Sequence, residues 1–443
     1  MTQRHGRRDL VPSSAIPLAY FAFAHVGLAV ALAVLLVRPD VPGGFFYHPR
    51  MVALVHLVTL AWLSGSILGA FYIVGPLALG LPMPGRWPDW VSFAAFASGT
   101  IGMVTHFWSG EYTWMAWSAT LVTGAIGWVA LRALRGMPRS PAPWPVKLHV
   151  VLAFFNILAA AVFGILIGLD RTTGFLGMPP LAATFAHAHL AAIGWATMMV
   201  VGLSYRLIPM MLPAAMPTGR SLALSAFFLE AGLGVVVVAL LAGSGWLLFG
   251  ALLITAGLGS FVVQIRRTLK RRMPKPPALP SRDWSTWQTH AALLWLIVAA
   301  ALGLVSSVGV PAAARIELAW FYGVAGLVGF LAQIVVGMQG RLVPMYAWYR
   351  ACAARRGEPP ALAANKLPSA RFAQPIFLAW SLGVPLMAPA LAFEQRAMIS
   401  VSAALLLGGV VTGAAYLAHM LHAAGSASRP EAGTLRTPGL TSS

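Results

Sequence analysis

The segment 56–77 has the sequence HLVTLAWLSGSILGAFYIVGPL and contains no Asp, Glu, Lys or Arg. A helix needs about 20 consecutive apolar residues to cross the hydrocarbon core of a bilayer, so this segment predicts a transmembrane helix. The whole chain has the same character, with 59% hydrophobic residues, 9% charged residues and a mean hydropathy of +0.78. Soluble domains usually carry about 25% charged residues, and we therefore expect lipid to be the main solvent of the surface.

Segments that meet the same criterion recur along the chain and predict an all-α polytopic membrane protein of about twelve transmembrane helices. A basic start without a small-residue cleavage site indicates that the first helix is retained and is not a signal peptide. The predicted helices are 16–37, 51–80, 89–108, 113–134, 146–169, 180–212, 220–242, 246–267, 286–309, 316–346, 372–392 and 397–422.

The basic residues predict the orientation. If the N-terminus is cytoplasmic, only five of the 30 Lys and Arg fall outside the cytoplasmic segments. This positive-inside bias favours an even number of spans, both termini in the cytoplasm and a bacterial-type inner membrane. It also accounts for the net charge of +19 without nucleic acid, because basic loops are attracted to an anionic leaflet. The five exceptions are Arg38, Arg50, Arg171, Arg315 and Arg396.

Two of the predicted helices share a sequence pattern. His56 is followed by Trp62, Gly69 and Pro76, and His189 is followed by Trp195, Gly202 and Pro209 at the same offsets. The helix 316–346 keeps the later part of the pattern, with Val324 at the position of the histidine. A repeat of this length predicts three pseudo-symmetric four-helix units, 1–145, 146–283 and 284–424, followed by a disordered tail, 425–443.

Three histidines in the outer half of the predicted bundle are the strongest candidates for a functional site. His187 and His189 are two residues apart and project about 200° apart on a helix, so they serve different sides of it. One of them is expected to meet His56, and two imidazoles on opposite faces of a porphyrin make a low-spin b-type heme. The other histidine faces the helix 316–346. What it binds there is left open: a five-coordinate heme, copper or nothing. That helix offers Gln333, Met338 and Gln339.

Two more polar residues are weighed as functional. His106 is a candidate metal ligand at the outer end of its helix, and Glu230 is a candidate for a proton path because it is an acid well inside a span. The single cysteine, Cys352, excludes a disulfide within the chain, and heme attachment through C-x-x-C-H is excluded as well. The remaining histidines of the helices are interpreted as hydrogen-bonded core residues: His25, His149, His290, His419 and His422.

The histidine pattern resembles subunit I of the heme-copper oxidases, especially the C-type and nitric-oxide-reductase branches. The segments 56–77 and 185–210, FAHAHLAAIGWATMMVVGLSYRLIPM, look most like the short subunit-I-like proteins of that superfamily. GMQGRLVPMY at 337–346 is similar to a helix end of the NnrS family of heme- and copper-containing membrane proteins. The resemblance implies heme b, a redox or small-gas function involving oxygen or nitric oxide, and an external electron donor such as a cytochrome or cupredoxin.

The chain departs from that superfamily at the copper site. The oxidases carry a histidine pair on helix 7, whereas the segment 220–242 contains no histidine. The usual copper ligands therefore cannot be transferred to this chain, and enzymatic oxygen reduction does not follow from the resemblance. Two alternatives to a redox protein are open. One is a transporter or a metal or heme assembly factor, since buried acids and repeats are typical of transporters. The other is a structural subunit.

Overall fold

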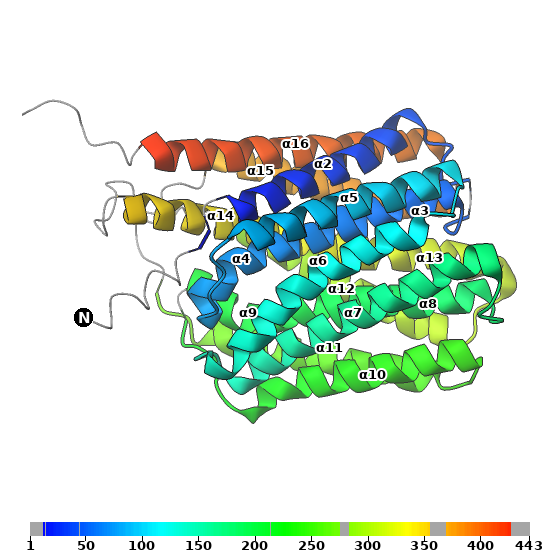
Figure 1. Cartoon of the computed structure of the whole chain (residues 1–443), viewed down its shortest axis with the longest axis horizontal. Coiled ribbons are helices and arrows are strands. Elements are labelled where there is room, and N and C mark those ends of the chain that lie inside the picture. The colour runs from blue at the N-terminus through cyan, green and yellow to red at the C-terminus, as the bar shows by residue number, and fades with distance from the viewer. Residues whose placement is uncertain are drawn as a thin grey trace, which may run out of the picture.

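The structure of the chain is a computed structural model that describes residues 12–13, 15–43, 45–212, 214–274, 283–354 and 369–426. These residues form a bundle of long, roughly parallel and antiparallel helices, and no β-strand occurs among them (Figure 1). The predicted all-α polytopic fold is thus confirmed. The predicted tail lies almost entirely outside the described residues.

Among the described residues, twelve helical rods correspond to the twelve predicted spans, and eleven of them are long and apolar enough to cross a membrane. The exception is α5, which packs along α6 and α3 and whose apolar residues are interrupted by Asp89, His106 and several Ser, Thr and Gly. Nine rods are single helices: α2 (Ile16–Val37), α5 (Trp87–Ser109), α6 (Met115–Gly136), α7 (Trp144–Thr173), α10 (Ala223–Ala242), α11 (Leu247–Lys270), α12 (Trp284–Ser307), α15 (Ala370–Ala392) and α16 (Arg396–Ser426).

The other three rods are composite, because a π-helical segment interrupts each of them. In a π-helix the backbone hydrogen bonds join residues five apart instead of four as in an α-helix, and such segments occur frequently at functional sites. The rods are α3 (Pro49–His56), η1 (Leu57–Ser64) and α4 (Gly65–Leu79); α8 (Pro180–His189), η3 (Leu190–Thr197) and α9 (Met198–Met211); and α13 (Arg315–Gly323), η6 (Val324–Ala332) and α14 (Gln333–Ala354). Short 3₁₀ turns are η2 (Met137–Arg139), η4 (Arg220–Leu222) and η5 (Ala312–Ala314).

The three composite rods lie at the centre of the bundle. Their π-helical segments η1, η3 and η6 contact one another, and α4 also contacts α9 and α14. The single helices surround them and pack in hairpins, α5 with α6, α10 with α11 and α15 with α16. Contacts of α6 with α7, α11 with α12 and α16 with α2 close the ring.

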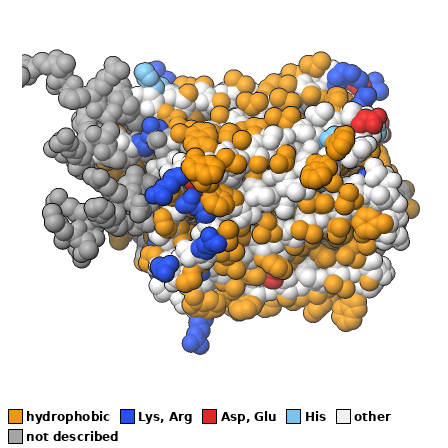
Figure 2. Space-filling model, viewed as in Figure 1, with side chains coloured by type: hydrophobic (Ala, Val, Ile, Leu, Met, Phe, Trp, Pro, Cys, Tyr) orange, Lys and Arg blue, Asp and Glu red, His pale blue; other side chains and the backbone are white. Residues whose placement is uncertain are grey.

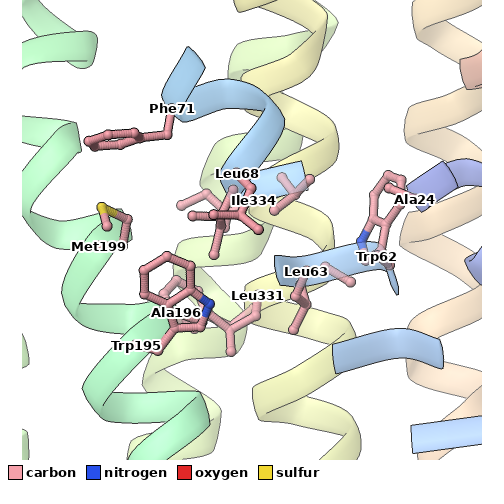
Figure 3. Close-up of a cluster of buried hydrophobic side chains, with 14 of the residues drawn as sticks. Ala24, Trp62, Leu63, Leu68, Phe71, Trp195, Ala196, Met199, Leu331 and Ile334 are labelled. Carbon is pink, nitrogen blue, oxygen red and sulfur yellow. The ribbon is translucent and has the colours of Figure 1, made fainter. Parts of the chain in front are cut away.

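The π-helical segments recur at equivalent positions of the sequence pattern. η1 begins directly after His56, η3 begins directly after His189, and η6 begins at Val324, where the third histidine would stand. Trp62 and Trp195 also occupy equivalent positions, yet Figure 3 shows Trp62 beside Ala24 of α2 and Trp195 on the opposite side of the cluster. The three predicted units stay a prediction.

The face of the bundle that Figure 2 shows is apolar along most of its length. Large apolar side chains of several helices, such as Val26, Phe155 and Val238, are mostly exposed, as expected for a surface that lipid solvates. Most described Lys and Arg lie at one end of the bundle, where α2 begins and where α4, α9 and α14 end. We call this end the basic end.

One charged side chain near the basic end is completely buried. Asp89, in the first turn of α5, forms an ion pair with Arg132 at 3.0 Å. Its carboxylate also accepts hydrogen bonds from the Tyr72 hydroxyl at 3.1 Å, the Trp128 indole at 3.0 Å and the backbone N–H of Arg86 at 2.8 Å. A buried charge is tolerated only when it is paired and hydrogen-bonded, and this network meets that requirement.

Candidate functional site

A cavity of about 750 Å³ lies inside the bundle and reaches the side chains of His56, His187 and His189. The volume is within the range of about 300–1,000 Å³ that is usual for small-molecule and cofactor sites. Most lining side chains are aliphatic, which is also typical of such sites. The three predicted histidines therefore belong to one cavity, although they come from two rods.

His56 is the last residue of α3 and borders the π-helical segment η1. Its Nδ1 lies 2.8 Å from the carbonyl oxygen of Val52, so Nδ1 carries the proton and donates it to that carbonyl. The ring also stacks on Phe107 of α5, with centroids 4.7 Å apart. Nε2 consequently keeps its lone pair, and no described residue hydrogen-bonds it.

His187 is oriented by a different helix. Its Nδ1 lies 2.9 Å from the carbonyl oxygen of Ala160 on α7, which again fixes the proton on Nδ1 and leaves the lone pair on Nε2. Gly164, one turn further along α7, lies against the ring: a Cβ at this position would be 2.9 Å from Cε1 of His187. His56 and His187 therefore both line the cavity, His56 against Phe107 of α5 and His187 against Ala160 and Gly164 of α7.

His189 faces the other side of the cavity, towards α13. Its Nδ1 lies 2.7 Å from the carbonyl oxygen of Phe185, and its Nε2 lies 3.3 Å from the hydroxyl of Tyr322. The two rings are stacked, with centroids 6.0 Å apart. Because Nδ1 donates, Nε2 accepts the hydrogen bond from Tyr322, and both nitrogens of His189 have protein partners.

Tyr322 is a cavity residue that the sequence analysis missed. A signal was present, since it is a hydroxyl-bearing residue two positions before Val324 on the helix that η6 interrupts. The polar residues proposed instead lie elsewhere: Gln339 donates to Ser66 at 3.2 Å, and neither it nor Gln333 lines the cavity.

The other two predicted site residues do not line this cavity. His106 lies at the end of α5, where its Nδ1 donates to the carbonyl oxygen of Glu111 at 2.7 Å. Glu230 on α10 is half-buried and accepts a hydrogen bond from Asn156 of α7 at 2.8 Å. Within the described ranges, no group of three or more His, Cys, Asp or Glu side chains is arranged to hold a metal ion.

His149 and His25, which lie nearer the basic end, are hydrogen-bonded to protein groups inside the bundle. His149 is fully buried, donates from Nδ1 to the carbonyl oxygen of Pro145 at 2.7 Å and bonds Ser225 through Nε2 at 2.9 Å. His25 donates to the carbonyl oxygen of Phe21 at 2.8 Å. Neither residue lines the large cavity.

The margin of the cavity that is farthest from the basic end also has arginine side chains. Arg315, the first residue of α13, is part of the lining. Tyr47 lines the cavity too, and the Arg171 guanidinium donates a hydrogen bond to its hydroxyl and lies 4.7 Å from the centre of its ring. The cavity therefore combines an apolar interior with a cationic margin.

No protein-family model and no curated protein matches the chain in sequence comparisons. The fold and the cavity define it as a polytopic all-α membrane protein in which three central composite helices surround a histidine-lined cavity.

Proposed function

We propose that this chain is a heme-binding redox protein of the membrane, in which His56 and His187 are the two axial ligands of one b-type heme. The observation that carries the proposal is that two imidazoles that line one cavity each donate from Nδ1 to a backbone carbonyl. This hydrogen bond sets the tautomer and the ring orientation, as is usual for histidines that ligate a metal through Nε2.

The size, polarity and charge of the cavity suit a heme. Small side chains such as Ala119, Ala160 and Gly164 line it beside the two histidines and leave room for a flat macrocycle. The aliphatic lining matches the apolar faces of a porphyrin, and Arg315 at the margin supplies a cation for its carboxylates. When bound, the heme would supply one-electron transfer, and the chain would orient its ligands and exclude water.

His189 is left out of this ligand pair for a physical reason. Its Nε2 lone pair already accepts a hydrogen bond from Tyr322, whereas Nε2 of His187 is not bonded by any residue that the structure describes. We therefore assign heme to His56 and His187, and do not assign copper to the side of Tyr322, because no three-ligand group is present among the described residues.

The resemblance to subunit I of the heme-copper oxidases supports the same proposal and suggests its setting. The chain would lie in a bacterial inner membrane with its basic end in the cytoplasm, as the positive-inside rule predicts. Electrons would come from a separate donor such as a cytochrome or cupredoxin. With both axial positions held by histidine, we propose electron transfer as its activity ahead of binding a gas such as oxygen or nitric oxide.

The experiment is an absorption spectrum of the full chain purified after heme-sufficient expression. We expect a Soret band, sharp α and β bands on reduction, and little change on adding carbon monoxide, because a bis-histidine iron has no open position. A featureless Soret region in the wild-type protein would refute the proposal.

Three single variants test the ligand assignment. His56→Ala and His187→Ala should lose the low-spin spectrum, whereas His189→Ala should keep it. Helical content measured by circular dichroism serves as the folding control for each. If His189→Ala lost the spectrum while His187→Ala kept it, the assignment of the ligands would be wrong even though heme is bound.

A further inference from the structure

A second, much smaller cavity lies where the last helices of the chain meet the first. Its volume is about 30 Å³, and it is bordered by α2, η1, α12, α14, α15 and α16. This is the seam at which α16 packs on α2 and closes the ring. The lining includes His25, Trp62, Gln288, Trp380 and Gly413.

Four side chains of this lining, including that of Tyr416 with its hydroxyl, present polar atoms without a hydrogen-bond partner among the described residues. Trp62 and Trp380 are each 1% exposed and have unbonded indole Nε1–H groups, and Gln288 is 2% exposed with both amide atoms unbonded. Buried polar groups in proteins nearly always have a hydrogen-bond partner, either protein or ordered water. Four such residues around one cavity therefore indicate a ligand with hydrogen-bonding capacity.

The hydrogen-bond donors and acceptors of the lining indicate which kind of ligand fits the cavity. The two indoles and the amide nitrogen donate, while the amide oxygen of Gln288 accepts. His25 adds a second acceptor, because its Nδ1 donates to Phe21 and its Nε2 keeps a lone pair. No carboxylate lines the cavity, which argues against a cation. A water molecule occupies about 10–15 Å³ on this measure of volume, so the space fits about two or three waters and no organic molecule.

We propose that this chamber binds a cluster of about two or three ordered water molecules that bridges the seam between the end and the beginning of the chain. Through these waters, Trp62 of η1 is linked to Gln288 of α12 and Trp380 of α15. Trp284 and Ser285 also line the chamber and directly follow Asp283, which is paired with Arg341 at the basic end. The part of the chamber that Trp284 and Ser285 line is thus close to the basic end.

The test is X-ray radiolytic footprinting of the full chain in ¹⁸O-labelled water, which marks side chains that contact bound water. Trp62, which lines this chamber and not the large cavity, and Trp380, which lines both, should incorporate label several-fold faster than Tyr205. That tyrosine is just as buried, at 1% exposed, but bonds Ser225 at 3.0 Å and lines neither cavity. Labelling of both tryptophans at the rate of Tyr205 or slower would overturn the proposal.

A glycine pair on α16 gives a matched control. A Cβ at Gly413 would lie 3.8 Å from Nε2 of His25, an ordinary contact that intrudes on the chamber, whereas a Cβ at Gly408 would have nothing within 4 Å. Gly413→Ala should reduce labelling of Trp62 and Trp380, and Gly408→Ala should not. Equal labelling in the two variants would count against the chamber as the source of the water.

If Gly413→Ala fails to fold, Gln288→Leu provides the second test. It removes one donor and one acceptor from the lining at similar size and should also reduce labelling at the two tryptophans. Unchanged labelling in a folded Gln288→Leu protein would contradict the proposal. The readout does not depend on heme, so it can fail or succeed independently of the proposed function.

Discussion

The replacement Gly164→Ala tests the heme site without removing either ligand. Gly164 is on α7, and the added Cβ would stand 2.9 Å from Cε1 and 3.3 Å from Nδ1 of His187. Carbon atoms in favourable contact are about 3.5–4.0 Å apart, so either the imidazole or α7 must move. The ring cannot turn freely because its Nδ1 is bonded to the carbonyl oxygen of Ala160 at 2.9 Å.

The expected magnitude follows from the cost of overpacking, which is about 1–3 kcal/mol for an inserted methyl group in a packed site. If that cost falls on the heme-bound state, in which His187 has to hold one position, heme affinity should fall by about 5- to 150-fold. If the apoprotein shares the strain, its thermal stability should fall instead, and the loss of affinity should be smaller.

The assay is titration of the detergent-solubilised apoprotein with heme, followed at the Soret band, together with thermal unfolding by circular dichroism. Gly124→Ala is the control, because a Cβ at Gly124 on α6 would have nothing within 4 Å. If Gly164→Ala bound heme with unchanged affinity and also kept its stability, the packing of Gly164 against the ring would not matter to the site, and His187 would be doubtful as a ligand.

Three further predictions concern residues around the site and the core. Asp89→Asn should lower the free energy of unfolding by about 3–5 kcal/mol, because Arg132 would keep a charge without its buried partner; thermal unfolding would show this, and a change below 1 kcal/mol would refute it. His149→Ala should cost about 3 kcal/mol but leave the heme spectrum intact, since both its ring nitrogens bond protein groups. Tyr322→Phe should leave the bis-histidine spectrum unchanged and cost about 0.5–1.5 kcal/mol of stability, because only its hydrogen bond to His189 is lost; disappearance of the spectrum would contradict the ligand assignment.

The positions of the helices could be predicted closely, because each span has to satisfy its own backbone hydrogen bonds in lipid and so leaves a long apolar run in the sequence. The predicted helix 16–37 and α2 have the same bounds, for example. The π-helical interruptions were not predicted. The residues of η1, η3 and η6 are as apolar as their neighbours, and a change from α to π register depends on how the central rods pack.

The candidate site could be predicted only in part. The two-residue spacing of His187 and His189 was enough to indicate that they face different sides of their helix, and the structure places them against α7 and α13 respectively. The sequence left open which of them shares a side with His56, and it drew attention to His106 and Glu230, which do not line the cavity.

The sequence alone determined that this chain is helical and lies in a membrane, because hydrophobicity and length are local properties that each segment carries by itself. It also marked the histidines, since polar groups stand out in apolar segments. Only the tertiary structure decided their partners: the carbonyl of Ala160, the hydroxyl of Tyr322 and the space left by Gly164 come from helices distant in sequence. The Nδ1 protons of His56 and His189 are held by carbonyls one turn earlier in their own helices, but the Nδ1 partner of His187 and the Nε2 partner of His189 are in place only after the rods have packed.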